Sequence, residues 1–498
     1  MPIARSVQFR VWFDWDIDGT FTDEAAYLIS AEGSTSYAPL YKSLLDGKGV
    51  VDSCTITLRN NTGRFSSRNS TAALYADLSD GGGYRIPVQI TVSIDGGNNF
   101  YAVFTGVTKA PVERTATTRS MRTVTIACRS NEELLLQARL STLQSNMVAY
   151  HDNAYSEAQI IEAWLVALGY SSGDYAIDPG MYTIPWAWLD DESPLEDIWM
   201  LASAAGGRFY ANASGVFCYE CASHYLANAH TVVADSLTRD DYADIELEWQ
   251  DADLYSRIVL ETAPRQEGAV AVVWEPDDAI VIPAGGSKTI TARFRQPVST
   301  ITDLAWKAKS SASQDITSSV TLAEPSYYAQ RVELTWSNAH ATRAAYLYGV
   351  KLSGTPLVGG PTQEVGVDYG DAAPKYWTDR GPRVKSLRGN PYIQTRSQAQ
   401  SLASFLFHQC REPRLRVTLR GAPGQPWYKL GDRLSVTDSL LMSAATEIMI
   451  DRIAWRLGAN GFAQDISGVD VTGGLYNKTD YFQLDVDALI ADPLPVFY

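Results

Sequence analysis

Segments in which apolar and polar residues alternate occupy both ends of this chain. Residues 7–13, 54–58 and 88–94 all follow this pattern, and clusters such as Asp95-Gly-Gly-Asn-Asn99 separate them. Successive side chains of a strand point to opposite faces, so a period of two predicts strands with one buried face. Gly, Asn and Asp are typical of the turns between strands. The chain is therefore expected to be mainly β, with residues 1–130 forming a first tube-like antiparallel β-barrel.

The period then changes to that of helices. Ser156 and Gln159 have the spacing of a capping box, and Ser193 and Glu196 repeat it with a proline between them. An apolar stripe follows each of these pairs, and each stripe ends at glycine. The expected elements are helices at 156–168 and 194–205 and strands at 208–211 and 216–220, together a small α+β module over residues 131–225.

The rest of the chain returns to strand patterns. Segments rich in β-branched and aromatic residues between 250 and 375 are separated by Gly, Ser, Pro and Asp, which predicts an inserted β-sandwich of immunoglobulin-like size. Thr395 and Gln398 predict a helix at 396–410. The domains expected beyond the α+β module are a second tube-like β-barrel made of residues 226–250 and 385–475, an inserted sandwich and connector at 251–384, and a C-terminal tail at 476–498.

Charge and cysteine content narrow the class of protein. The 498 residues carry a net charge of −16 without a basic stripe, which argues against a nucleic-acid-binding protein and suits a soluble surface or a channel wall that should not hold DNA. No apolar run approaches the roughly 20 residues of a membrane span. The five cysteines are scattered, and Cys218 and Cys221 should point to opposite faces of a strand, so we expect small buried side chains there.

The sharpest local motif is Asp14-Trp-Asp-Ile-Asp-Gly19. Alternating carboxylates before a glycine can offer oxygens to a hard cation, so Asp14, Asp16 and Asp18 are candidate calcium ligands. The twelfth position of an EF-hand loop would be Ala25, which cannot be a ligand. The alternative is an acidic β-turn in which the Asp side chains accept hydrogen bonds from nearby backbone N–H groups.

Signals for catalysis are weak. The five carboxylates between residues 190 and 197, with Trp186 and Trp188 as a sugar platform, could suit a glycosidase. Complementarity to a helix dipole and an aromatic core explain the same residues. None of the five histidines is paired at HxxxH spacing, and no nucleotide-binding loop or nucleophile elbow occurs in its proper context. We therefore expect no enzymatic activity and no cofactor apart from the candidate calcium ion.

Several segments, in their order along the chain, resemble the baseplate hub and tail-tip proteins of phages. No single motif carries this resemblance, which covers about residues 8–225 and 385–470. The segments that resemble the family are Asp14–Gly19, Leu58–Ser66, Phe104–Gly106, Ile184–Tyr210, Gly215–Phe217, the helix at 395–410, Val417–Gly421 and Leu430–Val436.

The resemblance implies a structural protein of the virion, assembled in the host cytoplasm. Such hubs are homotrimers with two tube-like barrels per subunit, so three copies present a six-fold-like ring to a hexameric tail tube. The implied partners are tail tube or distal tail proteins, the tape measure protein and central fibre or tip proteins, with roles in host attachment and DNA passage. Specific nucleic-acid binding is not implied.

Two other classes of function remain open from the sequence. The first is a virion-bound or secreted carbohydrate-binding adhesin, which a β-sandwich, tryptophans and a calcium loop would suit. The second is a glycan hydrolase, which needs two carboxylates roughly 5–10 Å apart in one cleft.

Overall fold

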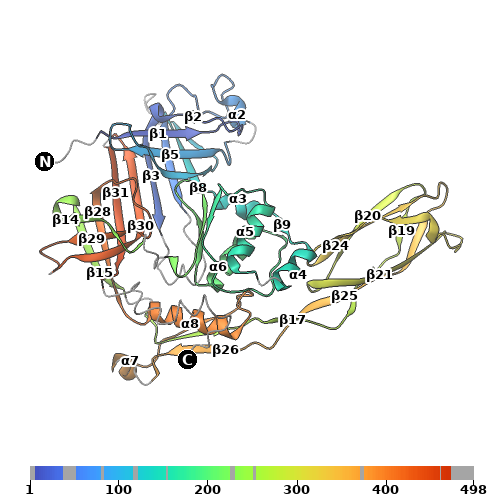
Figure 1. The fold of residues 1–498 in the computed structure, drawn as a ribbon. Helices are drawn as coiled ribbons and strands as arrows, with labels where there is room; N and C mark the ends of the chain where they lie inside the picture. Colours follow the sequence, from blue (N-terminus) through green and yellow to red (C-terminus); the bar gives the residue numbers. More distant parts are fainter. Residues whose placement is uncertain are drawn as a thin grey trace.

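A computed structural model describes residues 6–36, 52–79, 83–115, 122–152, 155–224, 230–250, 254–370, 375–442, 444–459 and 461–472. Strands far outnumber helices in this part of the chain (Figure 1), which confirms the prediction of a mainly β fold with an α+β insertion. The tail expected at 476–498 lies outside the described residues.

Strands from the N-terminal region curl around one apolar core. They are β1 (Gln8–Phe13), β2 (Thr22–Asp23), β3 (Leu28–Ser36), β4 (Ser53–Arg59), β5 (Pro87–Ser93), β6 (Tyr101–Thr108), β7 (Val112–Thr115) and β8 (Arg122–Ser130), with the short helices η1 (Ala25–Tyr27) and α2 (Tyr75–Ser79). Hydrogen bonds join them in the order β3-β4-β8-β6-β5-β1-β2. Alternate residues point inward, so Val11, Ile56 and Ile126 are fully buried with their neighbours.

Strands from the C-terminal region form a second set. They are β14 (Val233–Thr238), β15 (Asp244–Gln250), β28 (Arg414–Pro423), β29 (Arg433–Thr437), β30 (Thr446–Gly458) and β31 (Gly461–Asp470), and η4 (Arg239–Asp241) connects β14 to β15. Their order is β14-β29-β30-β31-β28-β15. All pairs are antiparallel except β14 with β29. Val417, Leu434 and Ile466 lie in the apolar interior of this set.

The long strand β30 joins the two sets into one sheet. Its first residues pair with β29, its last residues pair with β3, and β31 runs along its other edge. Gly33 of β3 lies opposite Trp455 of β30 at this seam. Strands from the two ends of the chain therefore share a single fourteen-stranded sheet, seen as blue and red strands side by side in Figure 1.

The α+β module packs between this sheet and the rest of the chain. Its elements are α3 (Glu132–Gln137), β9 (Leu140–Ser141), α4 (Gln144–Asp152), α5 (Glu157–Ala167), β10 (Tyr175–Ile177), β11 (Asp190–Glu192), α6 (Pro194–Ala204), β12 (Arg208–Ala211) and β13 (Phe217–Glu220). Both predicted helices are present. Ser156 and Gln159 form the expected capping box, and Trp164 of α5 is 2% exposed.

One predicted cap is wrong. Ser193 lies at the N-cap position of α6, but its side chain accepts no hydrogen bond from the helix. The Ser193 hydroxyl donates instead to the carbonyl oxygen of Leu135 in α3, at 3.2 Å. The tertiary contact between α3 and α6 has taken over the side chain that local spacing assigned to the cap.

The inserted sandwich projects as an arm (Figure 1). One sheet contains β17 (Arg265–Glu267), β18 (Ala271–Trp274), β19 (Ile280–Ile282), β21 (Val298–Lys309) and β25 (Ala345–Gly359). The other contains β20 (Ser287–Arg293), β22 (Val320–Leu322), β23 (Ser326–Tyr327) and β24 (Arg331–Asn338), with η5 (Thr317–Ser319) before β22. Trp336 and Leu352 are fully buried between the two sheets.

A strand expected in the sandwich lies elsewhere. Strand β16 (Arg257–Glu261) pairs with β26 (Glu364–Asp368) and β27 (Val384–Leu387) in a separate three-stranded sheet. Helix α8 (Arg396–Cys410) packs on this sheet, and the short α7 (Lys375–Arg380) precedes β27. The N-cap of α8 is Thr395, whose side chain accepts a hydrogen bond from the backbone N–H of Gln398 as expected.

Candidate functional site

The sheet shared by the two sets of strands has one apolar face and one polar face. In β4 the buried residues Cys54, Ile56 and Leu58 alternate with the more exposed Thr55 and Thr57. The same alternation occurs in β8 and in the second half of β30. The apolar face covers the two cores, whereas the opposite face presents hydroxyl groups and charges.

This polar face continues from one set of strands to the other. The register places its residues in rows across neighbouring strands. One row runs through Glu246, Thr418, Ser467, Arg452 and Ser36. A second row, four residues further along β30, runs through Ala463, Arg456, Glu32, Thr55 and Ala127. Strands from both ends of the chain therefore build one extended polar surface. Such a surface is a candidate for contacts in an assembly of several copies.

The charges of the polar face are paired rather than uniformly acidic. Arg420 contacts Glu246, and Arg456 lies 2.7 Å from Asp465. Arg416 lies 2.9 Å from the buried carboxylate of Asp451. The net negative charge of the chain suggested an acidic channel wall. This face differs from that expectation, because each of these three arginines has a carboxylate partner.

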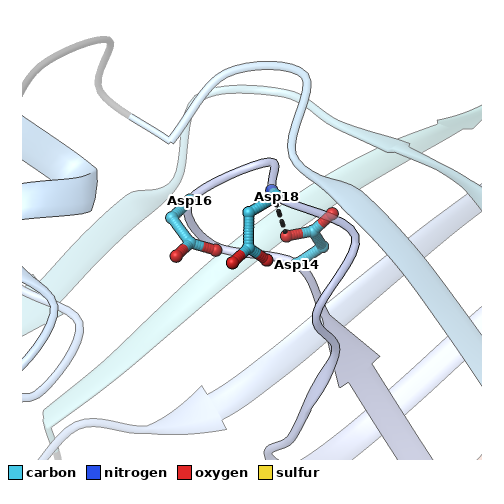
Figure 2. Close-up of side chains that lie close together, drawn as sticks. All are labelled: Asp14, Asp16 and Asp18. Atoms are coloured by element: carbon cyan, nitrogen blue, oxygen red, sulfur yellow. Dashed lines mark hydrogen bonds between the residues drawn. The ribbon is translucent and has the colours of Figure 1, made fainter.

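The acidic loop follows β1 (Figure 2). Oxygens of Asp14, Asp16 and Asp18 lie within 4.8 Å of one another. The buried Asp14 carboxylate accepts hydrogen bonds from the backbone N–H of Asp18 at 3.1 Å and of Gly19 at 2.9 Å. Residues Ile17 and Gly19 have positive φ, which closes the tight turn. The structure thus brings the three predicted ligands together and also shows the backbone bonds of an acidic turn.

The two exposed carboxylates of this loop differ in proton affinity. Desolvation and the neighbouring charges of Asp18 and Asp14 raise the pKa of Asp16. Hydrogen bonds from Thr20 lower the pKa of Asp18. A cation bound beside Asp16 would relieve the repulsion that this carboxylate experiences from Asp14 and Asp18.

Three residues of the candidate sugar site contact neighbouring side chains. Trp186 is 2% exposed and stacks on His151 with ring centroids 4.4 Å apart, so it offers no open platform. The Asp190 carboxylate faces Arg293 and Arg331, and Tyr392 donates a hydrogen bond to Asp197 at 2.5 Å. Asp197 and Asp190 are thus bonded to neighbouring side chains rather than aimed together into a cleft.

Cys218 and Cys221 of the CxxC motif are free thiols and do not form a disulfide. Burial raises the pKa of Cys218 to about 12 and that of Cys221 to about 11, so both are protonated at neutral pH. Cys218 lies within β13 and Cys221 directly after it. Cys221 is buried as expected, whereas Cys218 is only half-buried.

A polar network that the sequence did not reveal adjoins them. The His224 ring lies 2.7 Å from a carboxylate oxygen of Asp178 and 3.5 Å from one of Glu220. Burial opposes the charge of His224, but the hydrogen bond to Asp178 and the charge of Glu220 outweigh it and raise the pKa of His224. Arg208 holds the other oxygen of Glu220 at 3.1 Å. Glu220 and His224 are four residues apart, but Asp178 and Arg208 are more distant in sequence, so the fold is needed to bring the four together.

This network borders a cavity of about 590 Å³ where three parts of the chain meet. Strand β6 supplies Tyr101, the α+β module supplies Glu220, and the segment before β29 supplies Trp427. The rings of Tyr101 and Trp427 lie 5.5 Å apart, and Trp427 is 39% exposed. The cavity has the size of small-molecule and short-peptide sites.

Comparison with known proteins gave matches only among solved structures. No family model and no curated protein matches the chain. A tail protein from Neisseria meningitidis matches with a TM-score of 0.48 and 8% identity, covering 94% of this chain and 98% of that one. The 43 kDa tail protein of a Shewanella oneidensis prophage matches with a TM-score of 0.45 and 11% identity, covering 93% and 96%.

A third match is a component of the Escherichia coli type VI secretion system. Its description notes structural similarity to the T4 bacteriophage tail proteins gp27 and gp5; the TM-score is 0.38 and the identity 8%, with 89% of this chain and 73% of that chain covered. The first two of these proteins are described as tail proteins and the third as a secretion-system component. Among the helices of the described residues, none is long and apolar enough to cross a membrane.

Proposed function

We propose that the chain is a structural hub of a phage tail tip or baseplate. Copies of it would form a trimeric ring that continues or closes the tail tube and anchors the components of the tip. The observation that carries this proposal is the single sheet built from both ends of the chain, with its continuous polar face. A tube wall needs such a face toward its bore and an apolar face toward the body of the protein.

The two curled sets of strands supply the units of the ring. The first set packs around one apolar core, the second set packs on a core that it shares with the α+β module, and β3 and β30 join the two sets edge to edge. Three copies would place six such sets around an axis, which matches a six-fold tube. The ion pairs on the polar face leave little unbalanced charge to hold the DNA backbone, so DNA could pass without being retained.

The resemblance to tail hubs suggests the partners. The ends of the ring would contact tail tube or distal tail proteins and the tape measure protein, and the distal side would contact central fibre or tip proteins. The sandwich arm projects away from the shared sheet (Figure 1), so it would lie at the periphery of the tip. The proposed role is structural and not catalytic, in host attachment and DNA passage within the virion.

Cysteine labelling tests the orientation of the polar face. Ser30 lies exposed on β3, and Ser287 lies exposed on β20 of the sandwich. Ser30→Cys should react with a bulky maleimide in the free chain and lose most of that reactivity in assembled particles, because the probe would have to enter the bore. The matched Ser287→Cys should react in both. Equal labelling of Ser30→Cys in free chain and particles would contradict the proposal.

As a separate proposal, Asp14, Asp16 and Asp18 bind a calcium ion. The closeness of their oxygens supports this proposal, and hard cations favour carboxylate ligands. The ion would hold the loop after β1 and would have no part in chemistry.

A further inference from the structure

The cavity between the two sets of strands and the α+β module has a wall of aromatic rings. The rings of Tyr101 and Trp427 lie 5.5 Å apart at an angle of 59°, and the buried Tyr428 lies next to them with its ring 6.3 Å from that of Trp427. The Tyr428 hydroxyl is fixed by donating to Asp235 at 2.7 Å. Fixed, partly exposed aromatic rings are the surfaces that proline-rich segments bind, because a polyproline II segment is already extended and loses little entropy on binding.

The polar side of the same cavity is ordered by its own hydrogen bonds. Glu220 is 6% exposed and is held by Arg208 and Tyr210. Asp432 accepts a hydrogen bond from the backbone N–H of Lys429 at 2.8 Å. Since these carboxylates are already engaged, the aromatic wall is the part of the cavity most suited to a new contact.

One segment of this chain has the matching chemistry. Residues 491–498 read Ala-Asp-Pro-Leu-Pro-Val-Phe-Tyr, and they lie outside the described residues. Two prolines at a spacing of two favour polyproline II geometry. The apolar Val496 and Phe497 supply side chains for an aromatic pocket. Lys429 also lines the cavity, where it lies beside Asp432, so the match rests on the apolar residues and not on charge.

The chain leaves the described structure close to this cavity. Thr472 accepts a hydrogen bond from the backbone N–H of Glu447 on β30. Gly431, between two residues that line the cavity, donates to the carbonyl oxygen of Ile450 on the same strand. Three strand residues span about 10 Å. Residues 473–492 can extend several times that distance, so the segment can reach the cavity of its own copy.

We propose that Pro493–Tyr498 binds in this cavity of its own copy, against Tyr101 and Trp427. The segment would then contact both β6 and the segment before β29, which belong to the two sets of strands. This proposal is independent of the hub assignment, because it concerns the isolated chain.

Photo-crosslinking of the full chain tests the proposal. We would replace Phe497 by p-benzoylphenylalanine, irradiate a mixture of isotopically light and heavy copies, and map the crosslinked peptides by mass spectrometry. Crosslinks should join residue 497 to residues 100–103 or 426–432, with both peptides from the same copy. The same probe at Phe482, in the same tail but outside the proline segment, serves as the control and should not favour these residues.

A pair of surface variants checks the pocket side. Trp427→Ser should reduce the crosslink from residue 497 by several-fold, whereas Trp249→Ser, at a more exposed tryptophan on β15, should leave it unchanged. Circular dichroism confirms that both variants are folded. Crosslinks from residue 497 to other surfaces, crosslinks between light and heavy copies, or an equal yield with Trp427→Ser would each overturn the proposal.

Discussion

Glu132 joins the first set of strands to the α+β module through buried polar contacts. It is 3% exposed, accepts a hydrogen bond from the Ser130 hydroxyl at the end of β8, and accepts another from the Ala211 N–H of β12 at 3.0 Å. Burial raises the pKa of Glu132 to about 7. Its charge also raises the pKa of Asp52, for which burial is the larger cause. The joint therefore contains two carboxyl groups that are costly to ionise.

The stability of this joint should fall as the pH rises. The folded pKa of about 7 exceeds the ordinary value of 4.5, so the contribution of Glu132 is fully present below pH 4.5 and is lost as the pH passes 7. The loss should approach about 3 kcal/mol in alkaline solution. Chemical denaturation from pH 5 to 8.5 would measure it. Glu132→Gln should flatten the slope, and an unchanged slope in that variant would contradict the assignment.

Calcium should stabilise the loop after β1. The melting temperature should rise with calcium in the parent chain, by an amount that corresponds to about 2.7 kcal/mol at a hundredfold excess over Kd. Asp16→Asn should abolish the rise, because Asp16 is one of the three proposed ligands. Asp315→Asn, in an exposed turn of the sandwich, is the matched control. Identical melting curves in calcium and in chelator would contradict the calcium proposal and favour an acidic turn without a bound ion.

Trp164 anchors the α+β module. Its ring is buried with Ile160, Ile161 and Leu165 of the same helix. Trp164→Ala should cost about 3–5 kcal/mol of unfolding free energy, the range for emptying a buried aromatic site. Equilibrium denaturation measures this cost, with the exposed Val166→Ala as the control. A cost near zero would mean that the ring is not part of the core.

At the scale of elements, the seam between β3 and β30 decides whether the two sets of strands act as one body. A Cβ atom on Gly33 would lie 2.5 Å from a ring carbon of Trp455 and 3.0 Å from the carbonyl oxygen of Ser53. Only glycine allows the indole to cover the strand at this point. The aromatic ring thus fills the space that the missing side chain leaves at the seam.

Gly33→Ala should therefore destabilise the seam by about 1–3 kcal/mol, the usual cost of overpacking. Hydrogen exchange should become faster in β3 and in the second half of β30, while the sandwich keeps its protection. Gly359→Ala, on β25, where a Cβ would meet nothing within 4 Å and φ is likewise not positive, controls for the general cost of replacing a strand glycine. Unchanged exchange at β3 would show that the seam does not depend on this packing.

Local elements were predictable from sequence, and their partners were not. The capping box at Ser156 and the cap at Thr395 are set by residues three apart, so both helices could be placed. The pairing of Gly33 with Trp455 joins residues far apart in the chain, and a glycine within a strand pattern gives no sign of it. The sequence predicts strands between 250 and 375, and β16 is one of them. Its pairing with β26 and β27 could not be predicted, because an alternating pattern does not show which strands will be neighbours.

At the scale of the candidate site, the same limit applies. Asp14, Asp16 and Asp18 are adjacent in sequence, so their closeness could be predicted from the motif itself. Asp178 is distant in sequence from Glu220 and His224, and the cavity beside them exists only in the folded chain. The net charge of −16 is a sum over the whole chain, so it does not show which carboxylates form ion pairs with arginines on one face.

The whole molecule combines a sheet shared by both ends of the chain with a projecting arm. A sheet with open edges invites uncontrolled pairing, and a closed ring of copies would cover such edges. The proposed trimer would give the shared sheet a bore and leave the arm outside (Figure 1). The proposal therefore specifies the number of copies in the tip, their position on the tail axis and the orientation of their polar face.

Imaging the assembled particle by electron cryomicroscopy tests this statement most directly. The account predicts three copies around the tail axis at the tip, with the polar face of β3, β4 and β30 toward the bore and the sandwich arms outward. Copies found only along peripheral fibres, or a ring whose bore is lined by other strands, would contradict it.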